Sequence, residues 1–131
     1  MLYLSDVRDW LKSFGNAEHY YIGKLDNKKD KSIGVYQNNA RAPTRAIGQE
    51  STYEVKQISV LVHWNKNAKE TEQTAFELYE KLRAVSSCDL GSTHVYFITL
   101  NHAEPIDVGT DDNGVYERVI EFNLYYEKGF D

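Results

Sequence analysis

Two long stretches in which apolar and polar residues alternate constrain the fold of this 131-residue chain more than any other feature. They cover residues 53–64 and 115–127. Alternation with a period of two places successive side chains on opposite faces of a β-strand. At about 3.3 Å per residue, a strand of about 12 residues reaches roughly 40 Å. The sequence therefore predicts two strands that are long for so small a chain and that project beyond the core or line an edge which another copy completes.

The first of these stretches changes phase along its length. Ile58 and Val62 share one face of the predicted strand, whereas Tyr53 and Val55 lie on the other. Such a change indicates either a β-bulge near residues 56–57 or burial of both faces at one end of the strand. Both explanations keep the segment a single strand.

Two other segments have apolar residues at helical spacing instead of alternating ones. The first runs from Leu4 to Phe14 and is followed by Gly15, a common helix stop. The second begins at Asn67 and Glu70, which form a start like a capping box. Its apolar stripe consists of Ala75, Leu78, Leu82 and Val85. Both segments predict amphipathic helices that need a face of a sheet to cover them.

Shorter strands complete the predicted sheet. Residues 19–25 and 31–36 are expected to form a hairpin around the polar turn 26–30, and residues 95–100 form a further strand. Asn113 and Gly114 predict a hairpin turn that leads into the last strand. The fold class is therefore α+β, a mixed and mainly antiparallel sheet with two helices packed on one face, in the order α-β-β-β-α-β-β.

Length and composition favour one domain over residues 1–131 in a reducing compartment. Hydrophobic residues make up 41% and charged residues 27%, as in ordinary globular proteins. The single cysteine, Cys88, cannot form an intrachain disulfide. No window approaches the roughly 18 apolar residues that a membrane helix needs. We therefore expect a soluble, intracellular domain without a membrane partner.

Charge is distributed unevenly along the chain. Residues 1–50 contain eight Lys/Arg and six Asp/Glu, a net of +2, whereas residues 101–131 contain two and eight, a net of −6. The overall charge of −5 argues against general nucleic-acid binding, which depends on basic surfaces. A basic front and an acidic tail predict either two complementary surfaces that meet between copies or two ordinary solvated ends.

The candidate interface lies in a long polar segment and an acidic turn. Residues 37–52 have almost no large apolar side chain, and loops of this length are commonly functional or disordered. The alternative is an ordinary flexible loop and an ordinary turn. The residues predicted to make contacts between subunits are Asn38, Arg41, Arg45, Gln49, Asp111 and Asp112.

Catalytic and metal-binding patterns are weak in this sequence. Asp26 followed by Glu54-Val-Lys56 resembles the acid and Glu-x-Lys of small Mg²⁺-dependent nucleases, which hold the metal and activate water. The pattern is short, and Asp26 falls in a lysine-rich turn. The four histidines do not have the spacing of zinc ligands, and Cys88 has no partner cysteine. We expect a protein that is not an enzyme and that needs no metal or cofactor.

Three stretches together resemble a known family. They are residues 22–36, residues 60–64 leading into Thr71, Ala75 and Leu82, and residues 117–126. These stretches resemble the minor capsid proteins, or tail terminators, that join heads to tails in long-tailed bacteriophages. The resemblance implies a homohexameric ring between the tail tube and the head connector, with DNA passing through its lumen without specific binding. It also implies assembly in the host bacterial cytoplasm and a place at the head–tail interface of the virion. A head-completion stopper or a tail-tube subunit of the same virion is the alternative.

Overall fold

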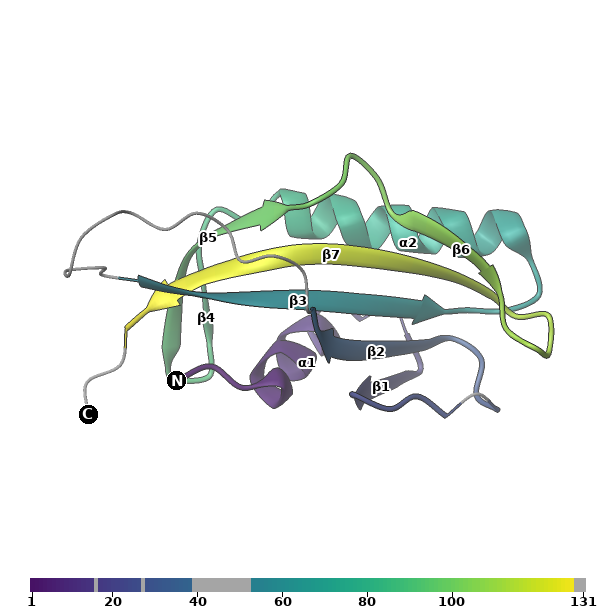
Figure 1. Cartoon of the computed structure of the whole chain (residues 1–131), viewed down its shortest axis with the longest axis horizontal. Coiled ribbons are helices and arrows are strands. Elements are labelled where there is room, and N and C mark those ends of the chain that lie inside the picture. The colour runs from purple at the N-terminus through teal and green to yellow at the C-terminus, as the bar shows by residue number, and fades with distance from the viewer. Residues whose placement is uncertain (16, 27, 39–52, 129–131) are drawn as a thin grey trace.

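Two long antiparallel strands run through the centre of the molecule (Figure 1). They are β3 (Tyr53–His63) and β7 (Tyr116–Glu127), and their register is unbroken from Tyr53 opposite Glu127 to His63 opposite Glu117. The computed structural model describes residues 1–15, 17–26, 28–38 and 53–128. The two long predicted strands are thus confirmed, and they pair with each other. They do not line an edge, because β2 flanks β3 and both β5 and β6 flank β7. The bulge predicted near residues 56–57 is wrong, because β3 pairs with β7 there without a shift.

Five shorter strands complete the sheet among the described residues. These strands are β1 (His19–Ile22), β2 (Ser32–Gln37), β4 (Cys88–Leu90), β5 (Thr93–Leu100) and β6 (Ile106–Thr110). The strand order is β1-β2-β3-β7-β5-β4, and β6 also pairs with β7. Strands β5 and β6 follow one another along the same edge of β7, with Leu100 opposite Phe122 and Ile106 opposite Val119. The sheet is mixed and mainly antiparallel, so the predicted α+β class is confirmed.

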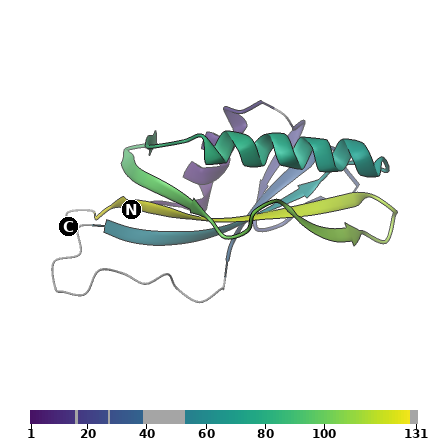
Figure 2. The same cartoon turned by 90° about the horizontal axis from the view of Figure 1, so that it is seen from above.

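Both helices cover the same face of the sheet (Figure 2). Helix α1 (Leu4–Lys12) packs against β1, β2 and β4, and α2 (Ala68–Arg83) packs against β3, β5 and β7. Three members of the stripe predicted for α2 are confirmed, because Ala75, Leu78 and Leu82 are buried. The fourth, Val85, lies beyond the end of the helix and is half-buried. Beneath the helices, the largest buried side chains of the strands are Ile33, Ile58, Leu90, Ile120, Phe122 and Leu124. This layer is the hydrophobic core, and it lies wholly on the helical side of the sheet.

Helix α2 begins at a side-chain cap. The Oδ1 atom of Asn67 accepts the backbone N–H of Glu70 at 3.0 Å, as the sequence pattern predicts. Asn67→Ala removes the acceptor and should lower the free energy of unfolding by about 1 kcal/mol. Denaturant unfolding measures this change, and Lys66→Ala, an exposed neighbour, should change it by less than about 0.5 kcal/mol. Equal effects of the two substitutions would show that the cap is not formed.

The predicted hairpin of the first two strands is wrong. Strands β1 and β2 pair in parallel, from His19 opposite Ser32 to Ile22 opposite Val35. The chain turns back after β1 at Gly23, whose φ is 65°, and turns again at Lys31, whose φ is 55°. Parallel pairing usually requires a longer crossover. Parallel pairing is possible here because β1 has only four residues. The connecting segment, residues 23–31, is long enough to return to the start of β1 before β2 begins.

Two short strands and one turn also differ from the sequence-based expectation. Strands β4 and β6 are absent from the sequence-based prediction. Strand β4 has only three residues, and β6 contains Asp107 and Gly109, which are uncommon in strands. In a two-residue hairpin turn of the Asn-Gly type, both residues have positive φ angles. Only Gly114 has one, at 80°. The β6–β7 turn therefore needs a single left-handed residue.

Candidate assembly surfaces

The predicted interface loop lies almost entirely outside the described residues. Arg41, Arg45 and Gln49 fall in residues 39–52, of which nothing is described. Asn38 is half-buried, and its backbone N–H donates to the carbonyl of Gln57 at 3.0 Å. This bond extends the pairing of β2 with β3 by one residue. The contact role of all four residues remains a prediction.

The predicted acidic turn is well defined, and its two aspartates differ. The Oδ1 atom of Asp111 accepts the backbone N–H groups of Asn113 and Val115, both at 2.9 Å. The N–H of Gly114 donates to the carbonyl of Asp111 at 3.1 Å. Asp112, by contrast, is exposed. Asp111 thus shapes the turn, and Asp112 is the one of the two that is open to a partner.

A buried histidine joins the two long strands beside this turn. His63 is fully buried, and its Nδ1 lies 2.9 Å from Oε2 of Glu117 and 3.8 Å from Oδ2 of Asp111. Tyr36 lies nearby, and burial together with the charge of Glu117 raises the pKa of its hydroxyl above the ordinary value. The group ties the end of β3 to the start of β7. The sequence offers no local signal for this group, because His63 and Glu117 are 54 residues apart.

An aromatic cluster lies on the face of the sheet that the helices leave open. The rings of Phe97 and Tyr125 stack at 4.2 Å between centroids, and Tyr53 lies 5.6 Å from Tyr125 and 6.4 Å from Phe97. Tyr126 points to the opposite face, where its hydroxyl donates to Oε2 of Glu54 at 3.1 Å. The cluster explains the phase change at the start of β3, because Tyr53 packs on the second face. Phe97 is 43% exposed and open to contact.

A groove lies between α2 and the connection from β5 to β6. Its volume is about 580 Å³, and the residues that line it are Glu72, Gln73, Phe76, Glu77, Glu104, Pro105 and Arg118. We call it the acidic groove. The hydroxyl of Tyr79 donates to the carbonyl of His102 at 2.7 Å, and Arg118 donates to Glu72 at 3.2 Å. These bonds fix its walls. Phe76, one of the lining residues, is 44% exposed. One sequence feature could have indicated this groove. Phe76 is an apolar residue that lies outside the buried stripe of α2.

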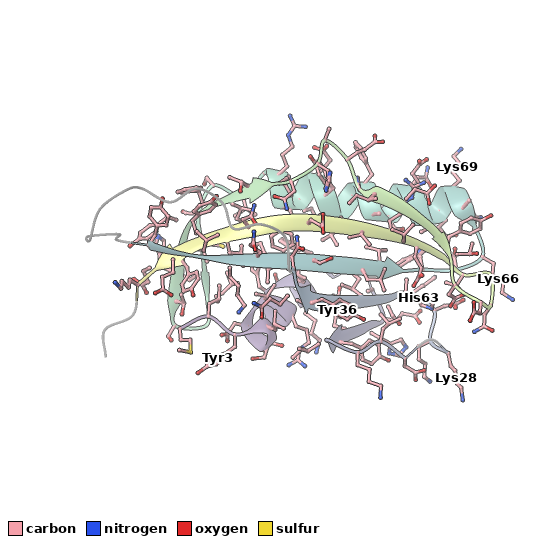
Figure 3. All side chains as sticks on the ribbon, in the orientation of Figure 1. Tyr3, Lys28, Tyr36, His63, Lys66 and Lys69 are labelled. Atoms are coloured by element: carbon pink, nitrogen blue, oxygen red, sulfur yellow. The ribbon has the colours of Figure 1, made fainter. Side chains whose placement is uncertain are left out.

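A basic turn lies at the other edge of the sheet. It is the connection between β1 and β2, residues 23–31, which we call the lysine turn. Lys24, Lys28 and Lys29 are exposed, and Lys28 points outward from the lower edge of the molecule (Figure 3). Asp26 shapes the turn, because its Oδ1 accepts the backbone N–H of Lys28 at 3.0 Å. Four of the eight basic residues of the first 50 thus lie in this one turn.

The three candidate nuclease residues do not come together. Asp26 lies in the lysine turn, where the N–H of Lys31 donates to the carbonyl of Trp64 just past the end of β3. Glu54 and Lys56 lie at the start of β3. Residues 54–64 span roughly 30 Å at about 3.3 Å per residue. The acid and the Glu-x-Lys pair therefore cannot hold one metal ion in this fold.

Carboxylates lie beside Cys88, His94 and His102. Burial and the charge of Asp89 raise the pKa of the Cys88 thiol, which is the opposite of the shift that activates a nucleophilic cysteine. His94 lies 2.7 Å from Asp89, and His102 lies 2.9 Å from Glu121.

Within the described segments, no helix is long and apolar enough to cross a membrane.

Comparison with known proteins identifies the family. No curated protein matches the sequence. Among solved structures, one chain aligns with 97% of this sequence and with 90% of its own length, at 18% identity and a TM-score of 0.46. A likeness at that level supports no statement about function. The family model of the bacteriophage tail terminator protein, however, matches residues 5–128, nearly the whole chain. The chain belongs to the bacteriophage tail terminator family.

Proposed function

We propose that this chain acts as a ring of six identical copies that caps the tail tube of a long-tailed phage and joins it to the head. The match of residues 5–128 to the tail terminator family carries the proposal. The fold supports it, because the acidic groove and the lysine turn lie on opposite edges of one sheet. Two different surfaces on one subunit favour head-to-tail contacts that close into a ring.

On this proposal the chain works through protein contacts and turns over no substrate. Its partners are further copies of itself, the tail-tube protein and a head connector or stopper. Assembly takes place in the bacterial cytoplasm, and the finished ring lies at the head–tail interface. The separation of Asp26 from Glu54 supports a role without nuclease chemistry.

The mode of self-association tests the ring. Sedimentation velocity and native mass spectrometry across a concentration series should show one closed assembly of six copies. A terminator stops at a closed ring, whereas a tail-tube subunit polymerises openly. Growth without a limit would favour the tube, and a strict monomer at every concentration would contradict the ring.

DNA should pass through the lumen without tight binding. The chain carries a net charge of −5, and like charges oppose contact with phosphates. Fluorescence anisotropy with double-stranded DNA at low salt should show no saturable binding by the assembled ring. Tight binding under these conditions would rule out a lumen of this kind.

The long polar loop is expected to contribute contacts through its arginines. Arg41→Glu combined with Arg45→Glu should leave the subunit folded, with an unchanged circular dichroism spectrum and unfolding midpoint, but should block ring formation or joining to tails. Tail joining is measured by electron microscopy of tails mixed with the purified protein. Normal assembly by the double variant would remove both residues from the interface.

A further inference from the structure

The acidic groove combines an exposed aromatic ring with unpaired negative charge. Its lining residues carry three carboxylates and one guanidinium, a net of −2. Arg118 pairs with Glu72 at 3.2 Å and with Asp107 at 3.8 Å. In the described part of the chain, no ion pair joins Glu77 or Glu104 to a cation. These two carboxylates are therefore available to a positively charged partner.

The lining of the groove also provides an apolar contact. Phe76 is 44% exposed, and its ring stacks on Tyr79 at 6.2 Å between centroids. The hydroxyl of Tyr79 is bound to the carbonyl of His102, so the ring beneath Phe76 is held in place. Pro105 is buried at the other wall. A partner that fits here must present cations around a small apolar group.

The lysine turn has these properties. Four lysines and two aspartates give residues 23–31 a net charge of +2. Across the described residues, Lys24, Lys28 and Lys29 form no ion pair. Leu25 is half-buried within the turn, and Ile22 just before it is 37% exposed. The turn therefore offers cations beside aliphatic side chains. The cations complement the carboxylates of the groove, and the aliphatic side chains complement its exposed aromatic ring.

The positions of the two surfaces determine which molecule can bring them together. The turn follows β1 at one edge of the sheet, and β6 lies on the far side of the two long strands (Figure 1). The groove is lined by Glu104 and Pro105, which come just before β6, by residues of α2 and by Arg118 of β7. One subunit cannot join its own two edges. We propose that the lysine turn of one copy docks into the acidic groove of the next copy. The contact is heterologous, and its repetition generates the ring. This inference rests on the proposed ring function and assigns its subunit contact.

Two charge-reversal variants test the contact. The groove variant carries Glu77→Lys and Glu104→Lys, and the turn variant carries Lys24→Glu and Lys28→Glu. Each variant alone brings like charges together at every contact. The concentration at half-assembly, measured by sedimentation velocity, should rise about tenfold or more. The matched controls are Glu80→Lys, on α2 outside the groove lining, and Lys12→Glu, at the end of α1, and both should assemble like the unchanged chain.

Mixing the two variants provides the sharper measurement. In an equimolar mixture, the reversed groove of one variant meets the reversed turn of the other, and the unchanged groove meets the unchanged turn. Alternating rings with an even number of subunits should form at concentrations where neither variant assembles alone. Native mass spectrometry should find the two chains in equal numbers. Assembly of either variant alone at the normal concentration would overturn the contact.

Cross-linking separates the contact from the ring itself. A carbodiimide couples a lysine to a carboxylate that it touches. In rings of the unchanged chain, peptides from residues 23–31 should be joined to peptides containing Glu77 or Glu104. A closed ring cross-linked only elsewhere would overturn the contact and leave the ring intact. A chain that remained monomeric at every concentration would overturn both proposals together.

Discussion

Replacing Phe122 with alanine should lower the free energy of unfolding by about 3–5 kcal/mol, the largest effect that we expect from a single substitution. Phe122 is fully buried at the middle of β7, opposite Ile58 of β3 and Leu100 of β5. Trp10 of α1 meets its ring edge-on at 6.5 Å between centroids. Truncation leaves a cavity that elements fixed on both sides cannot close. Chemical denaturation followed by tryptophan fluorescence measures the loss.

Phe76→Ala is the matched control for this substitution. The same aromatic group is removed from α2, but Phe76 is 44% exposed and its loss leaves no closed cavity. We expect a change of less than about 1 kcal/mol. Similar losses for Phe122→Ala and Phe76→Ala would contradict the placement of the core under the helices.

Asp111→Ala should destabilise the fold by about 2 kcal/mol, the second largest effect. One carboxylate oxygen accepts two backbone N–H groups of the β6–β7 turn, and Val115, which supplies one of them, is buried. Alanine leaves both donors without this acceptor. Asp111→Asn keeps an Oδ1 acceptor and should recover most of the loss. Thermal and denaturant unfolding of both variants measure the difference.

Asp112→Ala separates the structural aspartate from the exposed one. Asp112 lies in the same turn but is exposed, so its removal should change the free energy of unfolding by less than about 0.5 kcal/mol. Equal destabilisation by Asp111→Ala and Asp112→Ala would show that the carboxylate of Asp111 does not hold the turn. Loss of assembly with Asp112→Ala alone would support its predicted place in the interface.

The long elements of the fold could be predicted because their patterns repeat many times. The alternation in residues 115–127 and the stripe containing Leu78 and Leu82 each specify a buried face several times over. Strand β1 has four residues, too few to indicate its direction. Parallel and antiparallel pairing would expose the same side chains, and the choice depends on how Gly23 and Lys31 turn the chain.

The candidate surfaces could be predicted only in part, because they join residues that are distant in the sequence. The acidic groove combines the middle of α2 with Glu104 and with Arg118, and no local pattern connects these three segments. Charge counts along the chain indicated a basic front and an acidic tail. They could not show that Glu72 and Glu77 of α2 would line one groove with Glu104.

The interruption between β5 and β6 has a consequence for solubility. An unbroken partner strand along β7 would leave a straight outer edge of unpaired N–H and C=O groups, which invites uncontrolled aggregation. Instead, residues 101–105 separate the two strands, and shifts in pairing occur near Val95 and after Asp107. The resulting edge is short and irregular on either side of the gap. Such an edge is a poor template for unintended pairing with a strand of another chain.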